Sequence, residues 1–219
     1  MPSQTRITSF ADYKLLVSEH VYDPAEDSFF LAENLAVKRG DYVLDMGTGC
    51  GILAVVAAEK ASEIVAVDIN PYAVRCAKEN AKTNHVAEKI SVVQGDLFKP
   101  IRTAEEFDLI LFNAPYLPSK NVQEGSWLER AWAGGKGGRQ VIDRFTCESP
   151  KYLKKGGRIL LMQSTLSDAC ETLHGFKRQG LETDILAERA LPFFETLVIV
   201  KAKQTLEGIR RAHGSMKEG

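Results

Sequence analysis

Residues 42–58, YVLDMGTGCGILAVVAA, contain the strongest fold signal in the sequence. Residues 42–46 form a short apolar run of strand length, which ends in a glycine-rich turn at residues 47–51. An apolar run that predicts a helix follows from Ile52 to about Lys60. A strand that leads through such a turn into a helix is typical of the first unit of a parallel α/β sheet.

The rest of the chain continues this alternation of strands and helices. Asp23 and Pro24 have the pattern of a helix cap and a first helical residue, and they predict a helix as far as about Val37. Asn70 and Pro71 repeat that signal. Helices are therefore expected at 70–82, 138–153 and 166–179, and further strands at 63–68, 90–94, 107–113, 158–163, 183–187 and 196–201. The expected fold is α/β, with a mostly parallel seven-stranded sheet and helices on both faces.

Length and composition favour one globular domain. The chain has 219 residues, of which 44% are hydrophobic and 26% charged, and no apolar run approaches the length of a membrane span. The N-terminal residues lack the features of a secretory signal, so we expect a cytoplasmic protein. A single domain is expected over residues 1–203, followed by a flexible tail at 204–219.

Charge and cysteine content argue against several classes of function. The net charge of −1 gives no overall field for a polyanion, although a local basic patch stays open. The four cysteines are far apart and form no C-x-x-C pair, which argues against a zinc site. No metal is therefore expected.

The glycine-rich turn is the first candidate for ligand binding. Its G-x-G-x-G spacing, at Gly47, Gly49 and Gly51, differs from the dinucleotide pattern, because Ile52 stands where the third glycine of that pattern would fall. A tight structural turn is the alternative interpretation. As ligand contacts, the glycines would let the backbone pass close to a ligand, and Asp45 could accept a hydrogen bond from a cationic amino group.

Acidic residues also close the next two predicted strands. Asp68 is placed to bind both hydroxyls of a ribose. Asp96 is placed to accept from an exocyclic adenine amine, and Leu97 to pack against the ring. Because ligands bind beyond the carboxyl ends of parallel strands, these positions together predict a site for a nucleoside that carries a cationic amino-acid arm.

The strand at 107–113 ends in Asn113, Ala114, Pro115 and Tyr116, and a long loop follows. Asn and Pro are common turn formers, so these four residues alone allow an ordinary turn. The loop, residues 114–137, has no clear periodicity, and structureless loops of that length are usually functional. Trp132, Gly134 and Gly135 are candidates for a wall against which an acceptor lies. The alternative is a flexible hinge with a buried Trp.

Taken together, these motifs resemble a known family. The chain is similar to methyltransferases whose fourth strand ends in N-P-P-Y, and within them to the HemK-like release factor glutamine methyltransferases of the archaeal and eukaryotic type. The resemblance covers nearly the whole chain. It is carried by residues 21–28 (VYDPAEDS), residues 45–51, Asp68, residues 96–97, residues 113–116, residues 131–135 (AWAGG) and residues 141–145 (VIDRF).

This resemblance implies a Rossmann-like class I methyltransferase that uses S-adenosyl-L-methionine. It implies that the cofactor is contacted by Ser28, Asp45, Gly47, Asp68, Asp96, Leu97 and Asn113. It also implies a class 1 translation release factor as the substrate and a small zinc-binding Trm-type activator as a partner. The strand at 90–94 is apolar on both faces and would need a cover if it lay at the edge of the sheet.

The chemistry of the expected reaction fits the four residues at the strand end. The side-chain oxygen of Asn113 and the carbonyl of Ala114 can each accept one N–H of a planar NH₂ group, and Tyr116 can stack on that group. The family has proline where this chain has Ala114, but Pro115 still keeps residue 114 away from helical geometry.

Several acceptors stay open from the sequence. A glutamine side chain is the first, and a protein lysine is an alternative. The N6 amine of adenine in a nucleic acid is a third, although the chain shows neither a basic face nor added recognition surface for it. A cofactor-binding scaffold for a partner protein is the alternative of another class.

Overall fold

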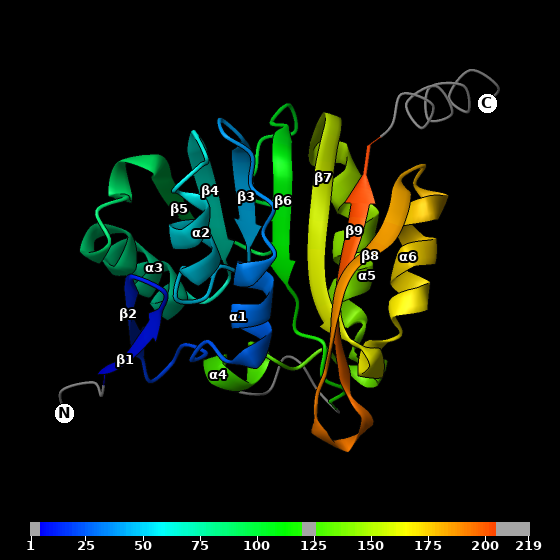
Figure 1. Cartoon of the computed structure of the whole chain (residues 1–219), viewed down its shortest axis with the longest axis horizontal. Coiled ribbons are helices and arrows are strands. Elements are labelled where there is room, and N and C mark those ends of the chain that lie inside the picture. The colour runs from blue at the N-terminus through cyan, green and yellow to red at the C-terminus, as the bar shows by residue number, and fades with distance from the viewer. Residues whose placement is uncertain (1–4, 120–125, 205–219) are drawn as a thin grey trace.

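The computed structural model describes residues 5–119 and 126–204. The main strands in these ranges are β3 (Tyr42–Met46), β4 (Glu63–Asp68), β5 (Ile90–Gln94), β6 (Phe107–Asn113), β7 (Leu153–Ser164), β8 (Glu182–Ala190) and β9 (Thr196–Lys203). They form a seven-stranded sheet in the order β5-β4-β3-β6-β7-β9-β8 (Figure 1). Neighbours from β5 to β7 are parallel, and β9 is antiparallel to β7 and to β8. The predicted mostly parallel sheet is confirmed.

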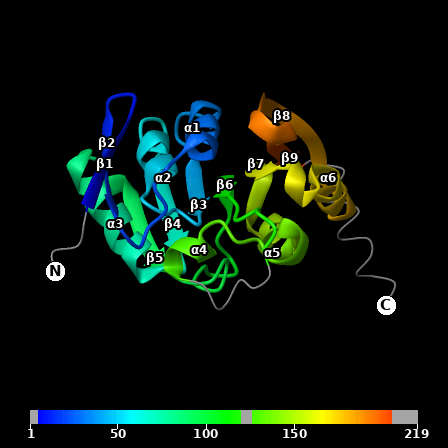
Figure 2. The same ribbon diagram turned by 90° about the horizontal axis from the view of Figure 1, so that it is seen from below.

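Helices cover both faces of this sheet, as Figures 1 and 2 show. The first face carries α1 (Glu26–Glu33), α2 (Ile52–Ala57) and α3 (Pro71–Thr83), and the second carries α5 (Gln140–Glu148) and α6 (Ala169–Arg178). Side chains of a strand point alternately to the two faces. In β6, Leu109 and Leu111 therefore pack into the core under α1 and α2, whereas Ile110 and Phe112 pack into the core under α5 and α6.

The two predicted helix caps have different outcomes. The Asn70 side chain accepts a hydrogen bond from the Tyr72 N–H and Pro71 begins α3, which confirms the cap there. The cap predicted at Asp23 is wrong, because α1 begins at Glu26 after an extended Ala25. The Asp23 carboxylate instead accepts a hydrogen bond of 2.6 Å from Thr8 Oγ1.

A hairpin that the sequence did not reveal precedes α1. It consists of β1 (Thr5–Phe10) and β2 (Tyr13–Ser18), which pair antiparallel. Two asparagines one turn apart complete the edge of β2. Asn80 on α3 pairs with both backbone groups of Leu16, and Asn84, the C-cap residue of α3, pairs with both of Lys14. Asn80 also donates to the Cys50 carbonyl at 2.8 Å, so the hairpin is connected to the glycine-rich turn.

The sequence predicts a structureless loop after β6, and this prediction is wrong. The loop contains the short helix α4 (Trp127–Arg130), which is capped by Ser126 and Glu129 in a reciprocal capping box. Such an S-x-x-E pattern is a recognised helix start, and the sequence contained it. Of the tail expected at 204–219, only Gln204 is described, and its N–H donates to the Gly157 carbonyl at 3.0 Å.

None of the helices in the described ranges is both long enough and apolar enough to span a bilayer.

Candidate active site

A cavity of about 810 Å³ opens at the carboxyl ends of β3, β4 and β6. The sheet order reverses between β3 and β6, which is where parallel α/β sheets bind ligands. The volume is in the range of sites for cofactors and drug-sized ligands. Among the residues predicted from the sequence, those that line it are Ser28, Gly47, Gly49, Asp68, Asp96, Leu97, Asn113, Ala114, Pro115, Tyr116 and Trp132.

The three glycines of the turn have different surroundings. All have positive φ, so none could be replaced without strain. Gly47 and Gly49 line the cavity. Gly51 lies behind it, where an added Cβ would be 3.1 Å from the Cα of Ala77 on α3. Gly51 therefore allows close packing of the turn on a helix, and it is not among the residues that line the cavity.

Asp45 lies beneath the turn and is fully buried. Its Oδ2 accepts hydrogen bonds from Thr48 Oγ1 at 2.6 Å and from the Ala54 N–H at 3.1 Å, while Oδ1 has no partner among the described residues. Burial raises the pKa of this carboxyl to about 7, against the two hydrogen bonds, which lower it. Asp45 holds the turn to the start of α2. Its contact with a cationic amino group stays a prediction, because the side chain does not line the cavity.

The raised pKa of Asp45 predicts how stability depends on pH in the ligand-free protein. A carboxyl with a folded-state pKa of about 7 and a usual value of 3.8 favours folding fully below pH 4, and this contribution is lost as the pH rises to about 7. We expect the free energy of unfolding of the wild type, relative to Asp45→Asn, to fall by a few kcal/mol, to order of magnitude, between pH 4 and pH 8. Urea unfolding of both proteins across this range measures it. A difference that did not change with pH would contradict the prediction.

Asp68 at the end of β4 orients the turn from the other side. Its Oδ2 accepts from the Gly49 N–H and its Oδ1 from the Asn70 N–H, both at 2.8 Å. Burial raises the pKa of this carboxyl, and the backbone hydrogen bonds oppose the rise. Each oxygen has lone-pair capacity beyond its one backbone donor. Asp68 can therefore accept two further hydrogen bonds from a ligand in the cavity.

Asp96 follows β5 and carries two ion pairs. Its Oδ2 is 2.8 Å from Lys99 Nζ and 2.9 Å from Arg144 Nη2, and the Arg144 side chain comes from α5. Partial burial acts to raise its pKa, but the hydrogen bonds and charges of Arg144 and Lys99 outweigh it and lower the pKa. The second oxygen, Oδ1, makes none of these contacts. Leu97 beside it is buried and has a φ of 49°.

Asn113 has a defined amide orientation. Its Nδ2 donates to Asp27 Oδ2 at 3.1 Å and to Ser28 Oγ at 3.2 Å, and both of these residues belong to α1. The Asn113 Oδ1 is buried and has no hydrogen-bond partner in the described part of the chain. Because a carboxylate can only accept, the amide must turn its NH₂ toward Asp27 and its oxygen away.

The next residues continue along the cavity. Ala114 is buried, and its N–H donates to the Met162 carbonyl of β7 at 3.2 Å, which extends the pairing of β6 by one residue. Pro115 and Tyr116 also line the cavity. Burial raises the pKa of Tyr116, and the Asp27 carboxylate raises it further. Tyr116 therefore stays a neutral phenol.

The glycine-rich segment after α4 supports this loop from behind. The Gly134 N–H donates to the Leu117 carbonyl at 2.8 Å. A Cβ on Gly134 would lie 2.6 Å from the Pro115 carbonyl oxygen, and one on Gly138 would lie 2.1 Å from the Tyr116 carbonyl oxygen. Gly134 and Gly138 therefore allow a close approach of backbone, and the backbone that approaches them belongs to the chain itself. Gly134 and Gly135 do not line the cavity, whereas Trp132 does and is 37% exposed.

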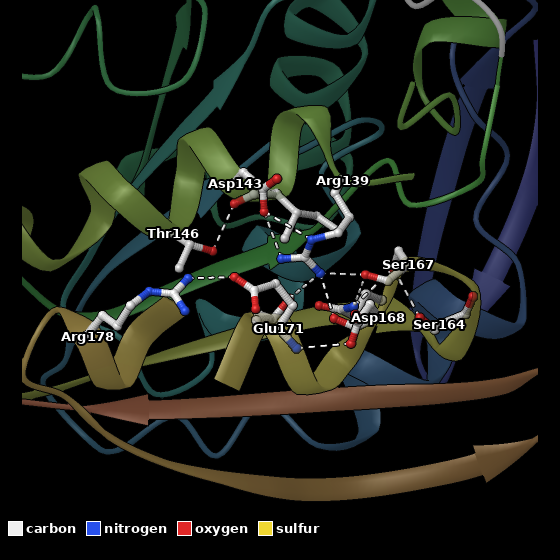
Figure 3. A network of polar contacts seen from close by, with 11 residues as sticks. Arg139, Asp143, Thr146, Ser164, Ser167, Asp168, Glu171 and Arg178 are labelled. Atoms are coloured by element: carbon white, nitrogen blue, oxygen red, sulfur yellow. Dashed lines mark hydrogen bonds and ion pairs between the residues drawn. The ribbon is translucent and has the colours of Figure 1, made fainter. Parts of the chain in front are cut away.

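Arg139 anchors the same segment to the loop between β7 and α6, as Figure 3 shows. Its Nη1 donates to the Ser167 carbonyl at 2.5 Å, the Asp168 carbonyl at 2.6 Å and Thr172 Oγ1 at 3.0 Å. Its Nε and Nη2 donate to Asp143 Oδ1. The guanidinium is therefore used within the fold, and it holds Gly138 against Tyr116.

Three cavity residues received no individual role from the sequence. Asp27 and Arg144 belong to the motifs at 21–28 and 141–145, but Asp27 lies in an acidic first turn and Arg144 on an amphipathic helix, which is also the pattern of surface residues. Trp127 lies in α4, within the loop for which no structure was expected. Among the described residues, no group of three or more His, Cys, Asp or Glu side chains could hold a metal ion.

Comparison with known proteins places this chain among methyltransferases. The family model of ribosomal protein L11 methyltransferase (PrmA) matches residues 28–114. The chain is 46% identical over 188 residues to the Methanocaldococcus jannaschii protein MJ0928, provisionally named a protein N5-glutamine methyltransferase, with 85% of this chain and 93% of that protein covered. It is 35% identical over 193 residues to human methyltransferase HEMK2, with 83% and 88% covered.

A solved structure agrees with these relatives. The E. cuniculi Mtq2–Trm112 complex, described as responsible for methylation of the eRF1 translation termination factor, matches with a TM-score of 0.64 and 25% identity. The match covers 84% of this chain and 99% of that one.

Proposed function

The chain belongs to the HemK-like family of S-adenosylmethionine-dependent methyltransferases, and from this we propose that it methylates the side-chain nitrogen of a protein glutamine. The acceptor is the Gln of the Gly-Gly-Gln motif of a class 1 release factor. Support for this acceptor comes from the relatives, since MJ0928 is named for N5-glutamine methylation and the Mtq2–Trm112 complex for methylation of eRF1.

The observation that carries the proposal is the unpaired acceptor at the end of β6. Asn113 Oδ1 is buried without a partner among the described residues, and Asn113 and Ala114 both line the cavity. A buried acceptor without a donor costs free energy unless a ligand supplies one. A primary amide has two N–H groups in one plane, and Asn113 Oδ1 and the Ala114 carbonyl can each accept one of them. The site thus selects a flat NH₂ group.

The remaining strand ends fit the cofactor. Asp68, with a free lone pair on each oxygen, would bind the two ribose hydroxyls. Asp96 Oδ1 would accept from the adenine amine beside Leu97. Gly47, Gly49 and Ser28 would lie along the amino-acid arm. S-adenosylmethionine, when bound, supplies an electrophilic methyl group on a sulfonium.

The residues of the chain contribute orientation and electron density. An amide nitrogen is a poor nucleophile because its lone pair is delocalised into the carbonyl. Two accepted hydrogen bonds, on Asn113 Oδ1 and the Ala114 carbonyl, increase the electron density on nitrogen and fix the direction of its lone pair. Holding the reacting atoms in line at about 3 Å can lower the barrier by roughly 7–11 kcal/mol. Tyr116, kept neutral by burial, would pack against the flat acceptor group.

The acceptor is tested by labelling. We expect radioactive methyl from S-adenosylmethionine to enter a class 1 release factor, and no label to enter the same factor with Ala in place of the Gln of its Gly-Gly-Gln motif. Peptide mass spectrometry should locate the added methyl on that Gln. Label that persists in the substituted factor would reject glutamine as the acceptor. A lysine acceptor would then appear as methyl-lysine in the same spectra.

A small zinc-binding protein of the Trm type is the proposed partner, since the related Mtq2 structure is a complex with Trm112. The edge position of β5 supports this, because within the described ranges the strand pairs only with β4, and 37% of Val93 is exposed. We expect low solubility of the chain alone and recovery on co-expression with the partner. A stable, fully active isolated chain would argue against the partnership.

Action on release factors also implies that the protein acts in the cytoplasm.

A further inference from the structure

We propose that Asp27 is a positioning residue, which acts through Asn113 and makes the Asn113 amide oxygen the acceptor in the site. This inference rests on the proposed function of that site. Asp27 lies in the first turn of α1, is only 7% exposed, and is among the residues that line the cavity. It does not reach the unpaired Asn113 Oδ1, and its contact is with the opposite end of the amide.

Hydrogen-bond capacity fixes the direction of the Asn113 amide. The Asp27 carboxylate can only accept, and the Ser28 hydroxyl donates its one hydrogen to Asp27 Oδ1 at 3.3 Å. Ser28 Oγ is then an acceptor toward Asn113. Both Nδ2 hydrogens of Asn113 are taken up by Asp27 Oδ2 and Ser28 Oγ. With the amide reversed, its oxygen would face a carboxylate oxygen without any hydrogen between them.

The other carboxylate oxygen of Asp27 is fixed as an acceptor too. Oδ1 accepts from the Ser28 N–H at 2.7 Å and from the Tyr22 hydroxyl at 3.2 Å. If Asn replaced Asp27, its side-chain oxygen would keep this position, because an NH₂ there would face the Ser28 N–H. Its NH₂ would then take the place of Oδ2 and face Asn113.

The Asp27→Asn substitution is expected to reverse the amide of Asn113. The Asn113 oxygen would turn toward the new NH₂, and its own NH₂ would turn into the cavity, where it would meet the acceptor's N–H groups donor to donor. We expect kcat to fall at least about 100-fold, because the acceptor nitrogen is no longer oriented toward the methyl group. The dissociation constant for S-adenosylmethionine should change less than about threefold, since the ribose and adenine contacts lie elsewhere in the cavity.

Exchange of the two residues provides the decisive test. In the double variant Asp27→Asn with Asn113→Asp, the new amide donates to one oxygen of the new carboxylate, and the other oxygen faces the cavity as an acceptor. The single variant Asn113→Asp sets two carboxylates against each other and should be as inactive as Asp27→Asn. We expect the double variant to be at least about tenfold more active than either single variant. If Asp27 only stabilised the fold, the free-energy losses of the two single variants would add in the double variant.

The measurements are kcat, KM for the release factor and S-adenosylmethionine affinity by calorimetry, with thermal melting of each variant. Asp23→Asn is the matched control, since that carboxylate precedes the same helix, is not among the cavity residues, and accepts from Thr8. It should retain wild-type kcat. A double variant no more active than Asn113→Asp overturns the proposal, and this comparison holds even if Asp27→Asn alone proves unstable.

The glutamine acceptor is tested with the wild-type protein, whereas the role of Asp27 is tested with the variants. If glutamine is not the acceptor, the wild type already fails on the release factor, and the variants are then compared on whichever acceptor the wild type methylates. If Asp27 does not set the amide, the wild type methylates glutamine normally and only the exchange of residues gives the unexpected result.

Discussion

The rate of methyl transfer by the Asn113→Ala variant is expected to fall by about 100- to 1,000-fold, while its affinity for S-adenosylmethionine falls only a few-fold. The substitution removes Oδ1, the buried acceptor that has no partner among the described residues, and leaves the acceptor amide held by one carbonyl alone. It leaves unchanged Asp68 and Asp96, which also line the cavity. The loss should therefore appear in kcat much more than in cofactor binding.

Single-turnover rates with saturating release factor, together with calorimetric titration of the cofactor, measure the two effects separately. Asn34→Ala is a suitable control, because that side chain donates to the Phe30 carbonyl at 2.8 Å and does not line the cavity. Wild-type rates in Asn113→Ala would exclude the proposed role of the strand end. An equal loss of cofactor affinity would assign Asn113 to the cofactor and not to the acceptor.

The second large effect is expected for Gly138→Ala. The new Cβ would lie 2.1 Å from the Tyr116 carbonyl oxygen, which is far inside van der Waals contact. It would also lie 3.1 Å from the Ser167 Cβ, which is a tight contact. The segment at 134–139 is held by Arg139, so the loop that carries Tyr116 has to move. A displacement of about 1 Å in a catalytic group can cost about 100-fold in rate. We expect a loss of that size in kcat, together with a lower melting temperature.

The neighbouring Gly137 provides a matched control. It has the same φ of 72°, but no atom of residues 5–119 or 126–204 lies within 4 Å of an added Cβ. Gly137→Ala should therefore incur only the cost of a left-handed backbone, about 1–2 kcal/mol, and keep its rate in assays at a temperature where it is folded. Similar activity in the two alanine variants would show that the contact with Tyr116 does not position the catalytic loop.

The sequence predicted the sheet accurately because local signals and burial agree there. The bounds of β3, β4, β5 and β6 match the predicted ranges, since each is a run of strand length bounded by turn residues. The N-terminal hairpin was missed, because its strands are completed by Asn80 and Asn84 on a helix more than 60 residues away. The cap at Asp23 failed for a similar reason, since Thr8 of the hairpin binds that carboxylate.

For the site, the order of residues along the chain specifies which residue types stand at the strand ends. In parallel strands these ends share one edge of the sheet, so Asp68, Asp96 and Asn113 could be assigned to one site from topology alone. The sequence could not say which way each side chain turns. Asp45 lies beneath the turn, and Gly134 faces the chain's own loop, because their surroundings come from distant segments.

The direction of the Asn113 amide depends on tertiary contacts. An asparagine side chain has a donor end and an acceptor end, and nothing in its neighbours along the chain selects between them. Asp27 and Ser28, more than 80 residues earlier, make that selection because α1 lies against the end of β6. The strand pattern thus determined where the acceptor group would lie, and packing of a helix against that strand determined that it is an oxygen.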